Sequence, residues 1–293
     1  MAVTDPMSAE AVLSEKEQLS TLSLVLRNRS VFWGGLLLLI MVAIAAVWPF
    51  FTVAPTDQNV MFRLKPPQAD YWFGTDFLGR DVFARVIHGA RVSLVVGLAV
   101  AVVATGAGLV MGLLAGYIRW LDAIIMRVMD GLMAIPAILL AIAMISISGA
   151  TLATVVVAIT IPEIPRVVRL VRAVVLTVRE EPYVEAAIAA GTRLPQILIR
   201  HILPNTIAPL IVQATYICGA AMLTESILGF LGAGIPPEIP SWGNIMSEGR
   251  TYFQISPWII FFPGVALALT VLAVNVVGDG LRDTLDPRIA RKM

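Results

Sequence analysis

Three acidic residues, Asp130, Glu163 and Glu225, stand inside or at the edge of long apolar runs. A carboxylate is costly in a hydrocarbon environment unless it faces a cavity or a partner group. Glu163 would lie deep in its run, and Arg166 and Arg169 follow it at helical spacing. We therefore weigh two roles for these acids, namely local ion pairs and groups that line or gate a transport pathway.

Asp130 has Arg127 one turn before it, which favours a local ion pair.

The cysteine and lysine residues exclude two kinds of site. Cys218 is the single cysteine, so the chain has no intrachain disulfide and no cysteine cluster for a metal. None of its lysines follows a glycine, so a Gly-x-x-x-x-Gly-Lys loop for phosphates is missing. We expect no covalent chemistry and no cofactor in this chain.

A polar stretch from Glu181 to Asn205 separates two of the apolar runs. At helical period, Val184, Ala187, Ile188 and Ala190 form a stripe of small residues that can pack close to a partner.

Gly191 is expected to end this first short helix. A second amphipathic piece, with Leu194 and Ile202 on its apolar side, follows until Pro204 makes the chain restart. The stretch therefore predicts two short helices in a hairpin.

The composition indicates a polytopic membrane protein. Of 293 residues, 58% are hydrophobic and only 14% charged, with a mean hydropathy of +0.85. A net charge of +1 argues against a nucleic-acid partner, which requires a concentrated basic patch. The first thirty residues are polar, so we expect no cleaved secretory signal.

The apolar runs predict an all-α fold with six transmembrane helices. The expected spans are residues 31–51, 92–115, 123–146, a fourth from about 151, 206–231 and 258–277. Five glycines between Gly97 and Gly116 would let the second span approach its neighbours closely. Pro136 would kink the third span, and Pro162 with Pro165 would disrupt the fourth.

The distribution of arginines and lysines predicts that both termini lie in the cytoplasm. The expected parts are a cytoplasmic tail (1–30), the first span (31–51), an outer segment (52–91), a five-helix core (92–281) that contains the cytoplasmic hairpin (180–204), and a cytoplasmic tail (282–293). Alternating charges around Arg80 predict an amphipathic helix on the outer membrane face. The loop 232–257 would also lie outside.

The hairpin resembles the coupling loop of bacterial ABC-importer permeases. The resemblance rests on a Glu-Ala-Ala triplet, a glycine four residues later and a distant Leu-Pro pair. His201 stands where the broadest form of this motif has an apolar residue. The peptide-importing subgroup often has His-Ile-Leu-Pro-Asn at this place. The resemblance implies contacts with an ATPase at Glu185, Ala186, Ala187, Gly191, Arg193, His201, Leu203 and Pro204.

Further motifs resemble the permeases of dipeptide, oligopeptide and nickel importers. They are Gly74-Thr75-Asp76, Leu78-Gly79-Arg80-Asp81, Gly89-Ala90-Arg91-Val92-Ser93 and the ending Gly278 to Arg288. Together the resemblances cover about residues 70–290. They imply the type I ABC-importer permease fold in a bacterial inner membrane.

The resemblance also implies partners. A second homologous permease would complete a heterodimer, two ATPase subunits would bind ATP and Mg, and an extracytoplasmic binding protein would deliver the solute. The expected contacts with the binding protein are Arg80, Asp81, Trp242, Glu248 and Arg250.

Two other functions stay open at this stage. A proton-coupled secondary transporter could use Asp130, Glu163 and Glu225 as relay carboxylates. The other alternative is a membrane scaffold or assembly factor. The solute is also open among dipeptides, longer peptides, glutathione, nickel chelates and opine-like compounds.

Overall fold

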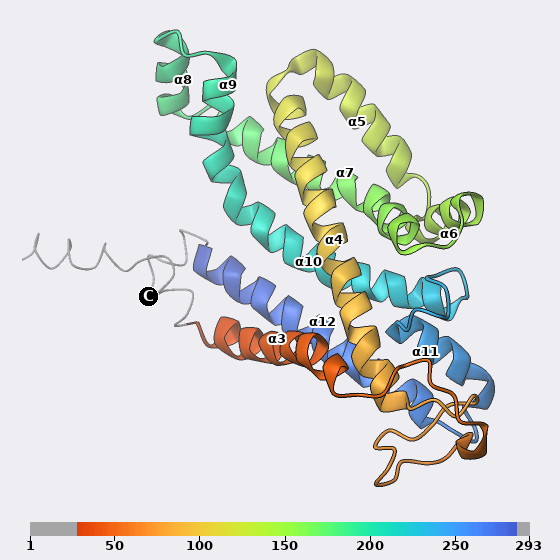
Figure 1. Cartoon of the computed structure of the whole chain (residues 1–293). Coiled ribbons are helices and arrows are strands. Elements are labelled where there is room, and N and C mark those ends of the chain that lie inside the picture. Colours follow the sequence, from red (N-terminus) through yellow and green to blue (C-terminus); the bar gives the residue numbers. More distant parts are fainter. Residues whose placement is uncertain (1–27, 286–293) are drawn as a thin grey trace, which may run out of the picture.

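A computed structural model describes residues 28–285, and this part of the chain is helical with no β-strand (Figure 1). The helices are α3 (Arg29–Val47), α4 (Val82–Tyr117), α5 (Arg119–Met133), α6 (Ala137–Ser148), α7 (Leu152–Val178), α8 (Pro182–Ala189), α9 (Leu194–Ile197), α10 (Leu203–Phe230), α11 (Trp242–Gly249) and α12 (Trp258–Leu285). The predicted all-α fold is confirmed. Most of the two predicted tails lies outside the described residues.

Four helical segments are long and apolar enough to cross a membrane. They are α3, α4, the continuous helix from Leu194 to Phe230, and α12. A fifth span exists if α5 and α6 together form one broken span. α7 is 27 residues long but contains Glu163 and several arginines, so length and composition do not by themselves identify it as a span. The predicted count of six is therefore not confirmed.

The third predicted span is not one kinked helix. α5 ends at Met133, α6 begins at Ala137, and their axes differ by 88°. Pro136 explains the break, because its ring disfavours helical backbone at the preceding residue and it has no N–H to continue the ladder.

Pro162 and Pro165 lie inside α7, so the prediction that they interrupt the fourth helix is wrong. Pro165 is buried, and α7 packs against α4 over much of its length. Packing by neighbouring helices can hold a helix together where a proline removes a backbone hydrogen bond.

The amphipathic helix predicted around Arg80 is wrong for residues 72–81, although the later part of the predicted stretch is helical from Val82. Residues 72–81 form turns, and α4 begins at Val82 and continues into the long apolar run. Gly79 adopts a φ of +75°, which helical backbone does not allow. Asp81 then caps α4 by accepting a hydrogen bond from the N–H of Phe83.

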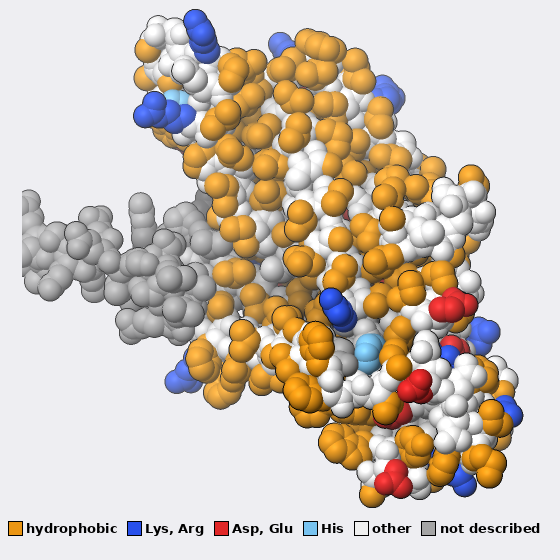
Figure 2. Space-filling model, viewed as in Figure 1, with side chains coloured by type: hydrophobic (Ala, Val, Ile, Leu, Met, Phe, Trp, Pro, Cys, Tyr) orange, Lys and Arg blue, Asp and Glu red, His pale blue; other side chains and the backbone are white. Residues whose placement is uncertain are grey.

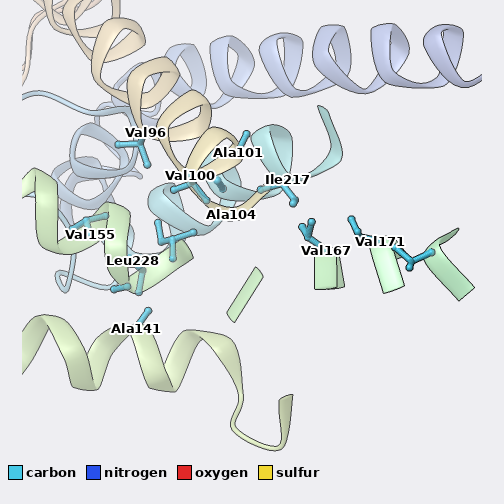
Figure 3. Packing of buried hydrophobic residues seen from close by; sticks show 14 of the residues in the cluster. Val96, Val100, Ala101, Ala104, Ala141, Val155, Val167, Val171, Ile217 and Leu228 are labelled. Atoms are coloured by element: carbon cyan, nitrogen blue, oxygen red, sulfur yellow. The ribbon is translucent and has the colours of Figure 1, made fainter. Parts of the chain in front are cut away.

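Contact between α4 and α7 forms the centre of the core (Figure 3). Three glycines of α4 at four-residue spacing face three valines of α7 at the same spacing. A Cβ added at Gly108 would lie 2.4 Å from the Cβ of Val167, and one at Gly112 would lie 2.6 Å from the Cβ of Val171. Gly116 meets Val175 in the same way, at 2.5 Å. Small residues thus let the two helices pack closely, and this van der Waals contact holds them together because lipid provides no hydrophobic drive between helices.

The hairpin and the outer segment lie at opposite ends of the molecule (Figure 1). α4 runs between these two ends, and α10 leads away from the hairpin. α3 packs against α12, where Gly280 and Gly34 admit Val31 and Val276 at close range.

Gly112→Ala should destabilise the protein, because the new methyl group would overlap Val171. Overpacking of this kind costs about 1–3 kcal/mol. Gly106→Ala on the same helix is the control, since nothing lies within 4 Å of its added Cβ. The unfolding temperature of both variants in detergent, followed by tryptophan fluorescence, measures the difference. Equal unfolding temperatures would contradict the assigned α4–α7 contact.

Candidate functional site: hairpin and outer cluster

The hairpin turns at Gly191, as the sequence predicts. Gly191 adopts a φ of +79°, its N–H bonds the carbonyl of Ile188 at 2.9 Å, and the N–H of Thr192 bonds the carbonyl of Ala187 at 3.1 Å. These two bonds form a Schellman motif, which ends a helix at a residue with left-handed backbone. Gly191 therefore terminates α8.

The second helix of the hairpin does not restart at Pro204, which corrects the sequence prediction. α9 passes through a π-helical turn (Leu198–Ile202) directly into α10, so that Leu194 to Phe230 is one continuous helix. Pro204 lies in the first turn of α10, next to the π turn. A π turn shifts the pattern of backbone hydrogen bonds. The helix can therefore continue through Pro204, although proline has no N–H to donate.

The hairpin is joined to the core. Val184, Ile197 and Ile202 are buried and belong to the same apolar cluster as Val175 and Val178 at the end of α7. Asn205 also links its two helices, because its Nδ2 donates to the hydroxyl of Tyr183 at 3.2 Å and to the carbonyl of His201 at 2.7 Å. The hairpin is thus connected to α7 through this cluster and to α10 through a continuous helix.

The opposite face of the hairpin is open. The predicted coupling residues Glu185, Ala186, Gly191, Arg193 and Pro204 are exposed. The other three, Ala187, His201 and Leu203, are partly buried. Basic side chains gather at this end of the molecule (Figure 2). The structure therefore brings the predicted coupling residues together on one small knob.

Asp76 is the centre of the outer segment. Its Oδ1 accepts hydrogen bonds from the N–H of Leu78 at 2.8 Å and of Arg80 at 2.9 Å. Gly79 is required by its positive φ and by its closeness to the carbonyl of Asn59. The Gly-Thr-Asp and Leu-Gly-Arg-Asp motifs thus encode one tight loop around a buried carboxylate.

Four charged side chains form a buried cluster that we call the outer cluster: Asp76, Arg80, Arg85 and Glu248. Arg80 contacts the carboxylates of Asp76 and Glu248, both at 2.6 Å. Arg85 lies 2.8 Å from Asp76 and also pairs with Glu248. Asp76 is fully buried and the Arg85 side chain is 1% exposed, so these charges depend on one another. The cluster joins the outer segment to the start of α4 and to α11.

Asp76 and Arg85 were not among the site residues predicted from the sequence. Their spacing from Arg80 signals a local pairing, but nothing in the sequence indicates Glu248, which lies more than 160 residues away.

The residues predicted to contact a binding protein are partly internal. Trp242 is fully buried and donates its indole N–H to the carbonyl of Val86 at 3.0 Å. Arg80 and Glu248 belong to the outer cluster, and only Asp81 and Arg250 present appreciable surface. Burial raises the pKa of the Asp81 carboxyl, and hydrogen bonds from the N–H groups of Phe83 and Ala84 oppose this rise.

The three acids of the apolar runs have different surroundings. Asp130 pairs with Arg169 of α7 at 2.6 Å, so the expected pair with Arg127 is wrong. The bend between α5 and α6 brings α5 beside α7 and makes the longer-range pair available. Glu163 pairs with Arg166 at 3.2 Å, which is one of the two partners considered from the sequence.

Glu225 is buried with no ion pair among the described residues. Its Oε2 accepts from the hydroxyl of Ser93 at 3.1 Å and lies 3.4 Å from that of Ser226. Its other oxygen has no hydrogen-bond partner. Among residues 28–285, no group of three His, Cys, Asp or Glu side chains could hold a metal ion.

Comparison with known proteins connects these features. Residues 104–291 match the family described as "Binding-protein-dependent transport system inner membrane component". The chain belongs to this family. It is thus the permease component of an ABC importer, a multi-pass inner-membrane protein and a non-catalytic transport subunit.

Individual relatives are similar over most of their length. The chain is 53% identical to a probable peptide ABC transporter permease protein, y4tQ, of Sinorhizobium fredii, over 91% of each chain. It is 43% identical to the dipeptide transport system permease protein DppC of Alkalihalophilus pseudofirmus, over 90% of this chain and 87% of the relative. An inward-facing structure of the MetNI methionine ABC transporter is similar with a TM-score of 0.49 and 23% identity, over 68% of this chain and 94% of that one.

Asp76→Asn should destabilise the permease strongly, because Arg80 and Arg85 would then share only the carboxylate of Glu248. Breaking a buried ion pair costs about 3–5 kcal/mol. Asp130→Asn is the control, since both side chains of its pair are about half exposed and such pairs contribute about 0–1 kcal/mol. Thermal unfolding of both variants in detergent tests the contrast. Equal small losses would show that the outer cluster does not stabilise the fold.

Proposed function

We propose that this chain is one of two homologous permease subunits in an ATP-driven importer of peptides or similar small solutes. Two ATPase subunits bind ATP and Mg, and an extracytoplasmic binding protein delivers the solute. The single observation that carries the proposal is the exposed hairpin, continuous with α10, at the end of the molecule opposite the outer cluster.

The hairpin suits a transmission element for two reasons. Its exposed face has small residues such as Ala186, so a groove on an ATPase can approach the backbone closely. Its buried face is packed on the end of α7 and is continuous with α10. Closure of the ATPase pair would therefore move both helices as one unit, and hydrolysis would reverse the movement.

The relatives support a peptide as the solute. Two similar permeases are named for peptides and dipeptides, at 53% and 43% identity. We propose the same class for this complex, with selection made largely by the binding protein. Asp81 on the outer segment and Arg250 in the loop 232–257, which both present surface, are the proposed contacts with that protein.

Both termini and the hairpin are proposed to lie in the cytoplasm, with the outer segment outside. This orientation follows from the excess of arginines near the hairpin. α7 then completes six spans, since its 27 residues correspond to about 40 Å at about 1.5 Å per residue.

Glu163 is a candidate for a residue that lines the transport pathway. Glu163 is mostly buried while its partner Arg166 is 58% exposed, so this pair borders an open surface that a second permease could cover. We propose that this surface faces the pathway. A proton relay through Asp130, Glu163 and Glu225 is a weaker alternative, because two of these acids are already paired with arginines.

Gly191→Val should abolish substrate-stimulated ATP hydrolysis and uptake together. A branched residue at a φ of +79° strains the turn by about 1–3 kcal/mol, which would tilt the hairpin without unfolding the spans. Gly191→Asn is the matched control, because asparagine is similar in size but tolerates this backbone conformation. ATPase activity and uptake are measured in the same vesicles, with and without loaded binding protein. Normal stimulation in Gly191→Val with normal subunit stoichiometry would show that the hairpin does not transmit the signal.

Single cysteines should establish the orientation in a Cys218→Ala background. Gln68→Cys and Glu238→Cys are exposed positions that should react with a membrane-impermeant thiol reagent in intact spheroplasts. Ala186→Cys on the hairpin should react only after lysis. Thr75 and Ser241 are unsuitable because both side chains are buried. The reverse pattern of labelling would invert the proposed topology.

A further inference from the structure

An apolar groove runs between α3, α4 and α10, with one residue of α12 at its edge. Its volume is about 610 Å³. Leu38, Leu94, Leu98, Val102 and Ile211 are among the side chains that line it. No residue of the hairpin or the outer cluster, and none of the three acids of the apolar runs, lines it.

One charged residue, Arg91, lines this groove. Arg91 is exposed and belongs to no ion pair within residues 28–285. The sequence has no further charge until Arg119, so Arg91 marks the border of the hydrocarbon region, where arginine meets lipid headgroups. Phe50, in the 3-10 turn Trp48–Phe50 that follows α3, lines the groove as well.

The rest of the groove offers little to a polar ligand. The hydroxyl of Thr105 donates to the carbonyl of Ala101 at 2.6 Å, and that of Thr215 donates to the carbonyl of Val212 at 2.8 Å. Both hydroxyls are thus bonded within their own helices. The occupant must therefore be apolar along its length, with a negative charge at the level of Arg91.

An acyl chain is apolar along its length and ends at a phosphate. A phospholipid therefore matches both the apolar lining of the groove and the position of Arg91 at its border. A spanning helix of the second permease would match the lining but would leave Arg91 without an anion.

We propose that this groove is a binding site for one anionic phospholipid, whose phosphate contacts Arg91 and whose acyl chain lies between α3 and α4. The bound lipid would fill the gap between α3 and the α4–α10 pair. The proposal depends on the membrane location of the chain and on neither its solute nor the direction of transport.

Retention of phosphatidylglycerol by the intact complex tests this site. The complex is equilibrated in nanodiscs that contain phosphatidylcholine and phosphatidylglycerol, extracted in mild detergent, and analysed by mass spectrometry. Wild type should retain phosphatidylglycerol in preference to phosphatidylcholine. Arg91→Gln should lower this retention about fivefold, the effect of one arginine beside an anionic lipid. Arg91→Lys should restore most of it.

Matched variants separate the groove from the general surface. Val102→Trp should block retention because Val102 lines the groove, whereas Val110→Trp should not, although both valines of α4 are similarly exposed, 61% and 58%. Arg119→Gln, at the other end of the uncharged run, should leave retention unchanged. Equal retention in Arg91→Gln and wild type, or in Val102→Trp and Val110→Trp, would overturn the proposal.

A photoreactive amino acid at Leu98 identifies the occupant directly, because Leu98 lines the groove. An adduct with phosphatidylglycerol supports the lipid site. An adduct with the second permease would show instead that the groove is a subunit interface, and would overturn the proposal.

Discussion

The close contact between α4 and α7 is the constraint on which the rest of the structure depends. Gly108, Gly112 and Gly116 let the two helices approach until valine side chains of α7 touch the α4 backbone. α4 carries Arg85 of the outer cluster at one end, and α7 leads directly into the hairpin at the other. Close packing of glycine against valine favours a rigid joint. A rigid joint lets a movement at one face of the membrane reach the other.

Much of this arrangement could be predicted from the sequence, because membrane burial leaves strong local signals. The apolar runs indicated the helices, and the glycine run indicated the close approach of α4 to a neighbour. Gly191 was correctly identified as the end of a helix, since only a residue that tolerates positive φ ends α8 this way. The hairpin motif and the outer motifs pointed to the family that the comparisons then confirmed.

The errors concern interactions that depend on tertiary structure. Proline residues alone did not decide where helices end, since α7 contains two of them while Pro136 separates α5 from α6. The partner of Asp130 could not be found locally because the 88° bend brings α5 to Arg169. Trp242 and Glu248 looked like surface residues of a polar loop, yet burial against α4 gives them structural roles. Sequence spacing does not carry such long-range information.

We propose that the hairpin is the surface on which an ATPase subunit acts. A photoreactive amino acid at exposed Ala186, in the intact complex in vesicles, tests this claim most directly. We expect an adduct with an ATPase subunit whose yield changes when a non-hydrolysable ATP analogue is added, and no such adduct from the same probe at Glu238. An adduct with the ATPase from Glu238, or none from Ala186 in an assembled and active complex, would contradict it.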